Sequence, residues 1–93
     1  MIRLATVGSG KIVSLFLKGL KTVPEIEHTA VYSRTRERGE TFAAEWGLAS
    51  SAVWTDMEKL ASSGEIDAVY LATPNRFHAA QAELFLSHGV HVL

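Results

Sequence analysis

The chain has 93 residues, 47% of them apolar and 20% charged, which suits one globular domain with a single hydrophobic core. Its formal net charge of -1 excludes the basic surface that nucleic acid or anionic lipid would need, and the absence of cysteine excludes disulfide scaffolds and thiolate chemistry. With no apolar run long enough for a membrane span or signal peptide, the composition predicts a soluble, cytoplasmic protein that binds neither nucleic acid nor membrane.

Strands and helices alternate from one end of the chain to the other. β-prone apolar runs predict strands at residues 2–7, 26–32, 52–54, 66–72 and 90–93, and helical spacing of apolar residues predicts helices at 11–21, 36–46, 55–64 and 73–87. Alternation of this kind requires parallel pairing with right-handed crossovers. The predicted fold is therefore α/β, a doubly wound parallel sheet with strand order 3-2-1-4-5.

Local signals place several of the helix ends. Pro24 ends the first helix, Gly47 closes the second, and Thr55 with Glu58 forms the pattern of a capping box at the start of the third. In the first helix the spacing of apolar residues predicts a buried stripe made of Ile12, Leu15, Phe16, Gly19 and Leu20.

A glycine turn follows the first strand and opens the first helix. Gly8 allows the tight turn, Gly10 lets a phosphate approach the backbone, and the amides that begin at Lys11 and Ile12 lie at the positive end of the helix dipole. The sequence thus predicts a pyrophosphate site over Gly8, Ser9, Gly10, Lys11 and Ile12. Val13 stands where the dinucleotide fingerprint has its third glycine, so an ordinary strand-to-helix connection stays an alternative, and Lys11 could equally be solvated.

The end of the second strand bears on the choice of cofactor. NAD-binding domains place an acid there for the ribose hydroxyls, whereas this chain has Ser33 and Arg34, with no acid before Glu37. A hydroxyl and a guanidinium suit a 2′-phosphate, so the residues favour NADP over NAD. The alternative is a solvated loop with surface arginines.

Thr73, Pro74 and Asn75 follow the fourth strand at the edge where open α/β sheets bind ligands. Thr73 and Asn75 are also good helix N-caps and Pro74 suits a first helical turn, so the segment could start a helix, line a site, or do both. His78 lies one turn further on, either at the cofactor edge or as a structural residue.

The other chemically notable side chains are interpreted as structural. His28, His88 and His91 lie on different elements without ligand spacing, so no metal site is predicted. Trp46 and Trp54 are expected to pack in the core, and Asp67 to be a surface carboxylate where the fourth strand begins.

These segments together resemble the glucose–fructose oxidoreductase/inositol dehydrogenase (Gfo/Idh/MocA) family over essentially the whole chain. The resemblance rests on residues 8–12, 30–34, 72–75 with His78, and 89–93. It implies an NAD(P)-dependent oxidoreductase acting on sugars, cyclitols or related hydroxy and keto compounds. In that family Thr73, Pro74 and Asn75 would lie beside the ribose and nicotinamide half of the cofactor.

The resemblance also implies a domain that the 93 residues do not include. The family continues with a Glu-Lys-Pro segment and a C-terminal domain that holds the substrate, the other catalytic groups and often the oligomer contacts. We therefore expect residues 1–93 to be an incomplete dinucleotide-binding domain, with no catalytic residue of its own and inactive by itself. Two other functions fit the strand and turn pattern: a non-catalytic nucleotide-sensing module, and a methyltransferase-like domain, which the absence of an acid after the second strand disfavours.

Overall fold

The computed structural model describes residues 1–8 and 10–93 and shows a five-stranded parallel sheet in the order β3-β2-β1-β4-β5. This confirms the predicted fold class and strand order. Strands and helices alternate along the chain, with a short 3-10 turn before β3. Their bounds are β1 Ile2–Val7, α1 Lys11–Leu20, β2 Ile26–Tyr32, α2 Arg36–Glu45, η1 Ser50–Ala52, β3 Val53–Trp54, α3 Met57–Ser62, β4 Ala68–Leu71, α4 Asn75–Ser87 and β5 His91–Val92.

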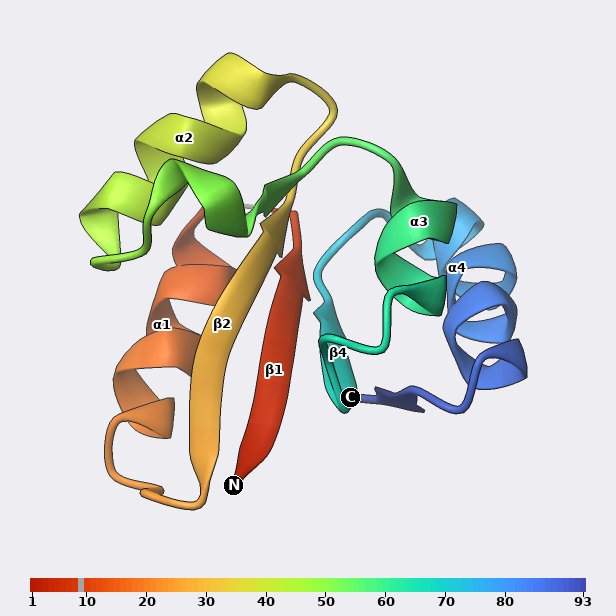
Figure 1. Cartoon of the computed structure of the whole chain (residues 1–93), viewed down its shortest axis with the longest axis horizontal. Coiled ribbons are helices and arrows are strands. Elements are labelled where there is room, and N and C mark those ends of the chain that lie inside the picture. Colours follow the sequence, from red (N-terminus) through yellow and green to blue (C-terminus); the bar gives the residue numbers. More distant parts are fainter. Residues whose placement is uncertain (9) are drawn as a thin grey trace.

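The helices form two layers, with α1 and α2 on one side of the sheet and α3 and α4 on the other (Figure 1). Two hydrophobic clusters fill the space between the layers, and Trp46 and Trp54 pack against one each, as expected. Under α1 and α2 the buried residues are Val13, Leu17, Val31, Phe42, Ala43 and Val53. On the α3 and α4 side they are Ala5, Val7, Ala30, Leu60, Ala61, Ile66, Val69, Leu71, Phe85 and Val90.

The predicted buried stripe of α1 is wrong in part. Val13 and Leu17 face the sheet and are buried, whereas Ile12 and Leu15 are each 68% exposed. Phe16 lies at the border of the two faces, where its ring stacks on that of Tyr70 with centroids 3.9 Å apart. The helix is apolar on more than one side, so two rows of residues satisfy helical spacing and periodicity alone cannot choose between them.

The helix starts also differ from the sequence prediction. Asp56, rather than Thr55, caps α3, because its Oδ1 accepts a hydrogen bond from the backbone N–H of Lys59. Thr35 caps α2 by accepting from the N–H of Arg38. Neither Thr73 nor Asn75 caps α4, whose N-cap position is held by Pro74 without a side-chain hydrogen bond.

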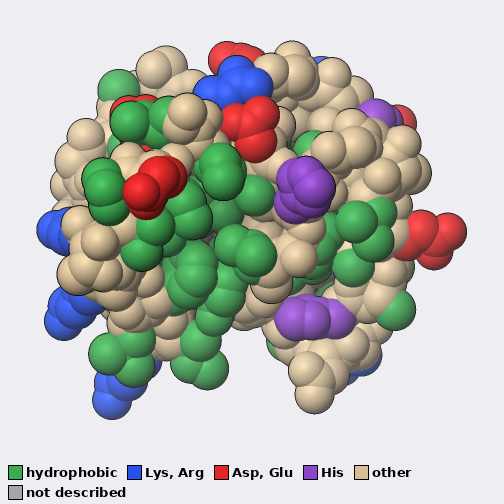
Figure 2. All heavy atoms as spheres, turned by 90° about the horizontal axis from the view of Figure 1, so that it is seen from below, with side chains coloured by type: hydrophobic (Ala, Val, Ile, Leu, Met, Phe, Trp, Pro, Cys, Tyr) green, Lys and Arg blue, Asp and Glu red, His purple; other side chains and the backbone are tan. Residues whose placement is uncertain are grey.

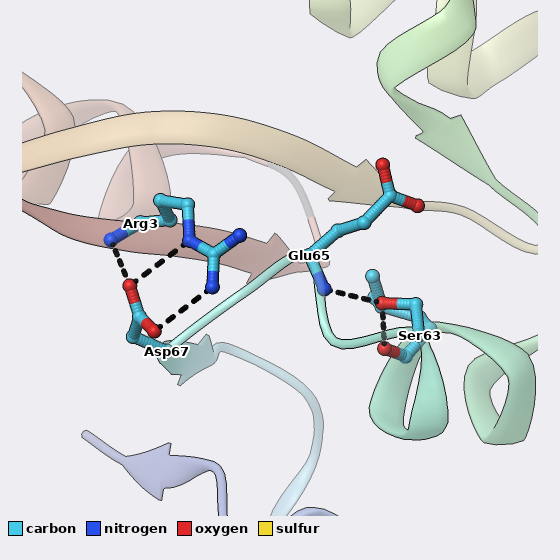
Figure 3. A network of polar contacts seen from close by, with 5 residues as sticks. Arg3, Ser63, Glu65 and Asp67 are labelled. Carbon is cyan, nitrogen blue, oxygen red and sulfur yellow. Dashed lines mark hydrogen bonds and ion pairs between the residues drawn. The ribbon is translucent and has the colours of Figure 1, made fainter.

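A polar network at the amino-terminal edge of the sheet holds β1 and the start of β4 together (Figure 3). Asp67 accepts hydrogen bonds from the backbone N–H of Arg3 at 2.8 Å and from its guanidinium Nε and Nη2 at 3.1 Å each. The side-chain hydrogen bond from Arg3 lowers the pKa of Asp67 to about 2. Asp67 is thus the surface carboxylate that the sequence predicted, and its bonds fix the register of the two strands.

The same edge exposes apolar residues. Figure 2 looks onto this edge and shows hydrophobic side chains gathered on it. The exposed ones in this region of the chain include Met1 at 81%, Ile2 at 44% and Val23 at 37%. The hydrogen bonds of Arg3 and Asp67 and these exposed apolar side chains thus lie at the same edge, opposite to the glycine turn.

His28 is a half-buried ring inside the sheet. Its Nε2 lies 3.0 Å from the hydroxyl of Thr6, a fully buried residue of the neighbouring strand. Burial of the ring lowers the pKa of His28 to about 4, because removal from water disfavours the imidazolium. His28 is therefore neutral in the folded protein at pH 7, and its role is structural, as the sequence indicated.

We expect the folded state to lose stability as pH falls from 6.5 toward 4. In this window the unfolded chain takes up a proton on His28 and the folded chain does not, so protonation favours unfolding. The loss between pH 7 and pH 5 should be on the order of 1 kcal/mol, allowing for the part of the ring that remains near solvent. Urea unfolding of the wild type and of His28→Gln at both pH values measures it. An equal pH dependence in the two proteins would contradict this account.

Candidate functional site

The predicted site residues gather at one edge of the sheet because their strands are neighbours and run parallel. Gly8 follows β1, Ser33 follows β2 and Thr73 follows β4, and β1 pairs with both of the other strands. The loops after β1 and β4 are in direct contact, since the N–H of Ala72 donates to the carbonyl of Val7 at 2.9 Å. This carboxyl-terminal edge is where doubly wound sheets hold their ligands.

The glycine turn needs glycine for two separate reasons. Gly8 has φ +100°, and a Cβ built on it would lie 2.9 Å from the carbonyl oxygen of Ala72, which is too close. Gly10 has φ +111°, and a Cβ there would meet nothing within 4 Å. Gly8 therefore lets the turn pass the β4 loop, and Gly10 faces open space. Ser9, also predicted at this site, lies outside the described residues.

The start of α1 is open to an anion. Among the described residues no side chain caps it and no acidic residue lies in its first turn, and its first helical bond runs from the N–H of Ser14 to the carbonyl of Gly10. The amides of Lys11, Ile12 and Val13 come before that bond and have no acceptor within the helix. They lie at the positive end of the helix dipole, directly after the open turn.

The four helices differ in this respect. α2 and α3 each have a side-chain cap and a glutamate in the first turn. α1 and α4, which follow the neighbouring strands β1 and β4, have neither. In the part of the chain that the structure describes, the helix starts without a cap or a first-turn acid are thus those that follow adjacent strands of the sheet.

A cleft of about 610 Å³ lies between α1 and α2, next to the glycine turn. This volume is within the usual range for small-molecule sites. The lining residues come from the first turns of α1 and from one face of α2, and they are Gly10, Ser14, Thr35, Glu37, Arg38, Thr41, Phe42 and Glu45. The cleft therefore extends from the glycine turn to a face of α2 that carries both acidic and basic side chains.

Arg38 in this cleft is a residue that the sequence prediction missed. Thr35, Arg38, Phe42 and Glu45 follow one another at intervals of three or four, so they share one face of α2. That spacing was visible in the sequence, but the prediction considered only the end of the second strand. Glu37 also reaches the cleft, which brings an acid near the expected ribose position.

The three arginines after β2 have different surroundings. Arg36 donates to the carbonyls of Ser50 and Val53 and so ties α2 to η1 and to the first residue of β3. Arg34 is exposed and, within the described residues, has no side-chain hydrogen bond, while Ser33 is half-buried. Neither Ser33 nor Arg34 lines the cleft itself; both lie on the loop just before its α2 wall.

At the start of α4, a side-chain hydrogen bond links the loop after β4 to the helix. The hydroxyl of Thr73 donates to Oε1 of Gln81, two turns into the helix, at 2.5 Å. Pro74 and Asn75 are exposed beside it, and His78 is half-buried one turn later. The predicted residues Thr73, Pro74, Asn75 and His78 thus lie together at the same edge as the glycine turn.

The opposite edge offers a smaller cavity without any of the predicted site residues. It measures about 300 Å³ and is lined by residues of the α3–β4 and α4–β5 connections, among them Asp67, His88 and His91. Over residues 1–8 and 10–93, no group of three or more His, Asp or Glu side chains could hold a metal ion. Over the same residues no helix is long and apolar enough to cross a membrane.

Comparison with known proteins places the chain in a protein family. A family model described as an oxidoreductase family with an NAD-binding Rossmann fold matches residues 2–93. A scyllo-inositol 2-dehydrogenase (NADP(+)) of Bacillus subtilis is 43% identical over all 93 residues, which are 28% of its own length. A 4-carboxy-2-hydroxymuconate-6-semialdehyde dehydrogenase of a Sphingobium species is 34% identical over 91 residues, 98% of this chain and 28% of that one.

Solved structures show the same likeness. An oxidoreductase from Thermotoga maritima matches 98% of this chain and 28% of its own, with 42% identity and a TM-score of 0.87. A scyllo-inositol dehydrogenase from Lactobacillus casei, solved with bound cofactor NAD(H) and scyllo-inositol, matches 99% of this chain and 27% of its own, with 26% identity and a TM-score of 0.82. The chain therefore spans little more than a quarter of the relatives that it matches.

Proposed function

The chain belongs to the Gfo/Idh/MocA oxidoreductase family with an NAD-binding Rossmann fold, and on that premise we propose that residues 1–93 form the cofactor-binding domain of an NADP-preferring dehydrogenase. The observation that carries the proposal is the uncapped start of α1 behind a glycine turn that faces open space. A pyrophosphate there would accept hydrogen bonds from backbone amides and lie at the positive end of the helix dipole.

The proposed pyrophosphate site consists of Gly8, Ser9, Gly10, Lys11 and Ile12. Gly10 leaves room for the phosphate oxygens, and the amides of Lys11 and Ile12 donate to them. The ammonium of Lys11 adds positive charge without a fixed geometry. The side chain of Ile12 is exposed, and its part in the proposed site is that of its backbone amide.

The adenosine end of the cofactor is proposed to lie in the cleft between α1 and α2. Ser33 and Arg34 would bind a ribose 2′-phosphate, and Arg38 on the cleft wall supports this assignment. Glu37 is the feature that favours NAD instead, because a carboxylate accepts hydrogen bonds from unmodified ribose hydroxyls. Arg34 and Arg38, together with the hydroxyl of Ser33, lead us to propose NADP, and the two acids on the cleft wall, Glu37 and Glu45, make NAD the alternative.

The nicotinamide end would then reach the loop after β4, where Thr73, Pro74, Asn75 and His78 lie. When bound, the nicotinamide supplies the hydride acceptor or donor. Thr73 and Asn75 orient its ribose and ring through hydrogen bonds, Pro74 stiffens the loop, and His78 supports it from the first turns of α4. We assign no catalytic residue to this chain, so the proton transfer partner of the reaction belongs to the remainder of the full-length protein.

The substrate class is proposed from the relatives. The relatives described above are dehydrogenases of scyllo-inositol and of a 4-carboxy-2-hydroxymuconate semialdehyde. We propose a sugar, cyclitol or related hydroxy or keto compound, bound mainly by a domain outside residues 1–93. Cytoplasmic location and assembly into an oligomer through that domain stay predictions.

The proposal predicts that NADPH stabilises the chain. A ligand that binds only the folded state raises stability by RT ln(1 + [L]/Kd), about 2.7 kcal/mol at one hundred times Kd. Thermal unfolding with and without NADPH measures the effect, with S-adenosylmethionine at equal concentration as the control for the methyltransferase alternative. An unfolding temperature that NADPH and NADH leave unchanged would contradict the cofactor assignment.

A further inference from the structure

The hydroxyl of Thr73 makes an unusual hydrogen bond for a residue at the start of a helix. A threonine at the N-cap position usually accepts a hydrogen bond from a free amide of the helix, but Thr73 lies one residue before the N-cap, Pro74. Thr73 instead donates to the side-chain oxygen of Gln81, two turns along α4, and the contact is partly buried. Its helix begins without any side-chain cap.

Gln81 is placed for this contact by the helix itself. Residues 74, 77, 78 and 81 recur at intervals of three or four, so they share one face of α4. His78 and Gln81 are both half-buried on this face, while Glu83 on another face is exposed. The side chain of Gln81 is thus half-buried on this face of α4, and its Oε1 accepts the hydrogen bond from the Thr73 hydroxyl in the loop before the helix.

The loop that Gln81 holds is the one in contact with the glycine turn. Thr73 follows Ala72, whose carbonyl oxygen limits the space beside Gly8 and whose N–H bonds to Val7. A shift of Thr73 would therefore move the loop against the turn. We propose that Gln81 is a positioning residue for the cofactor: it fixes Thr73 and leaves the hydroxyl oxygen facing the ligand as a hydrogen-bond acceptor only.

This inference rests on the proposed function and adds a chemical statement to it. A threonine hydroxyl has one proton and two lone pairs. With the proton committed to Gln81, the oxygen accepts hydrogen bonds, so it selects a donor on the ligand, such as a ribose hydroxyl or the amide N–H of a nicotinamide. The uncapped amides of α4 stay available to the same ligand.

Two substitutions at position 81 test the inference in the 93-residue chain. Gln81→Met keeps the length of the side chain and removes the acceptor, and we expect it to weaken NADPH binding about fivefold to twentyfold. Gln81→Glu keeps an oxygen that accepts from Thr73 and should bind NADPH within about twofold of the wild type. Glu83→Met, on the exposed face, is the matched control and should change nothing. Tryptophan fluorescence titration gives the dissociation constants.

The decisive comparison is with Thr73→Val. If Gln81 acts through Thr73, the double variant Thr73→Val/Gln81→Met loses no more affinity than Thr73→Val alone, because the two residues form one unit. Additive losses, or a Gln81→Met variant that binds as well as the wild type, would overturn the inference. A wild type that fails to bind NADPH would instead refute the proposed function, so the two failures are distinguishable. Thermal unfolding of each variant without cofactor separates a loss of stability from a loss of positioning.

Discussion

Gly8→Ala should destabilise the domain by about 2–6 kcal/mol, the largest effect that we expect from a single methyl group. A non-glycine residue at φ +100° costs on the order of 1–3 kcal/mol. The added Cβ would also lie 2.9 Å from the carbonyl oxygen of Ala72, and overpacking against a backbone costs roughly another 1–3 kcal/mol. Since domains of this size have a total stability of about 5–15 kcal/mol, much of the chain could unfold at 37 °C.

Gly47→Ala is the matched control for this prediction. Gly47 also has a positive φ, +75°, but a Cβ there would meet nothing within 4 Å. It should therefore show only the cost of the left-handed backbone conformation, about 1–2 kcal/mol. Urea unfolding of the three proteins gives the comparison. Equal losses at Gly8 and Gly47 would show that contact with Ala72 contributes nothing, and the account of the turn would be wrong.

Arg34→Ala should weaken NADPH binding about tenfold to a hundredfold and leave NADH binding nearly unchanged. Loss of a hydrogen bond between charged groups typically costs about 1.5–3 kcal/mol, and each 1.4 kcal/mol is a factor of ten. NADH has no 2′-phosphate and cannot lose this contact. Arg34 is exposed and bonded to no other described side chain, so its removal should not disturb the fold.

Arg36→Ala provides the control on the neighbouring arginine. Its guanidinium is bonded to the carbonyls of Ser50 and Val53, so its loss should lower stability without changing the ratio of NADPH to NADH affinity. Fluorescence titrations with both cofactors measure that ratio. If Arg34→Ala weakens both cofactors equally, Arg34 does not read the 2′-phosphate. If wild type prefers NADH, the acid at Glu37 governs the ribose and the NADP proposal is wrong.

The fold could be predicted from the sequence because its signals are repeated. Four strand-to-helix units, each ended by glycine, proline or a polar turn, indicate a parallel α/β sheet with right-handed crossovers. The observed order β3-β2-β1-β4-β5 is the one typical of dinucleotide-binding sheets. The choice of buried face in α1 was not decided in the same way. Ile12 and Leu15 are as apolar as Val13 and Leu17, and only the position of the sheet selects the second pair.

The sequence predicts which loops form the site, because the order of the strands decides which loops share an edge. It does not predict the side-chain contacts within the site, because those depend on packing. Glycines after β1 and a Thr-Pro-Asn segment after β4 come together because parallel strands share an edge. The cap of α3 shifted by one residue because Asp56 and Thr55 are both good caps, and the geometry of the turn decides between them. The hydrogen bond from Thr73 to Gln81 joins the loop before α4 to a residue two turns into the helix. It depends on the rotamers of both side chains, and no sequence pattern indicates it.

The central claim is that the carboxyl-terminal edge of the sheet, around the glycine turn, binds the cofactor. Amide chemical shifts of the ¹⁵N-labelled chain during an NADPH titration test it most directly. We predict shifts for Gly10, Lys11, Ile12 and Arg34, with the residues of the opposite edge, Asp67 and His91 among them, unaffected. The claim would be contradicted if the chemical shifts changed only at that opposite edge. It would also be contradicted if saturation with NADPH left the amide shifts of α1 unchanged.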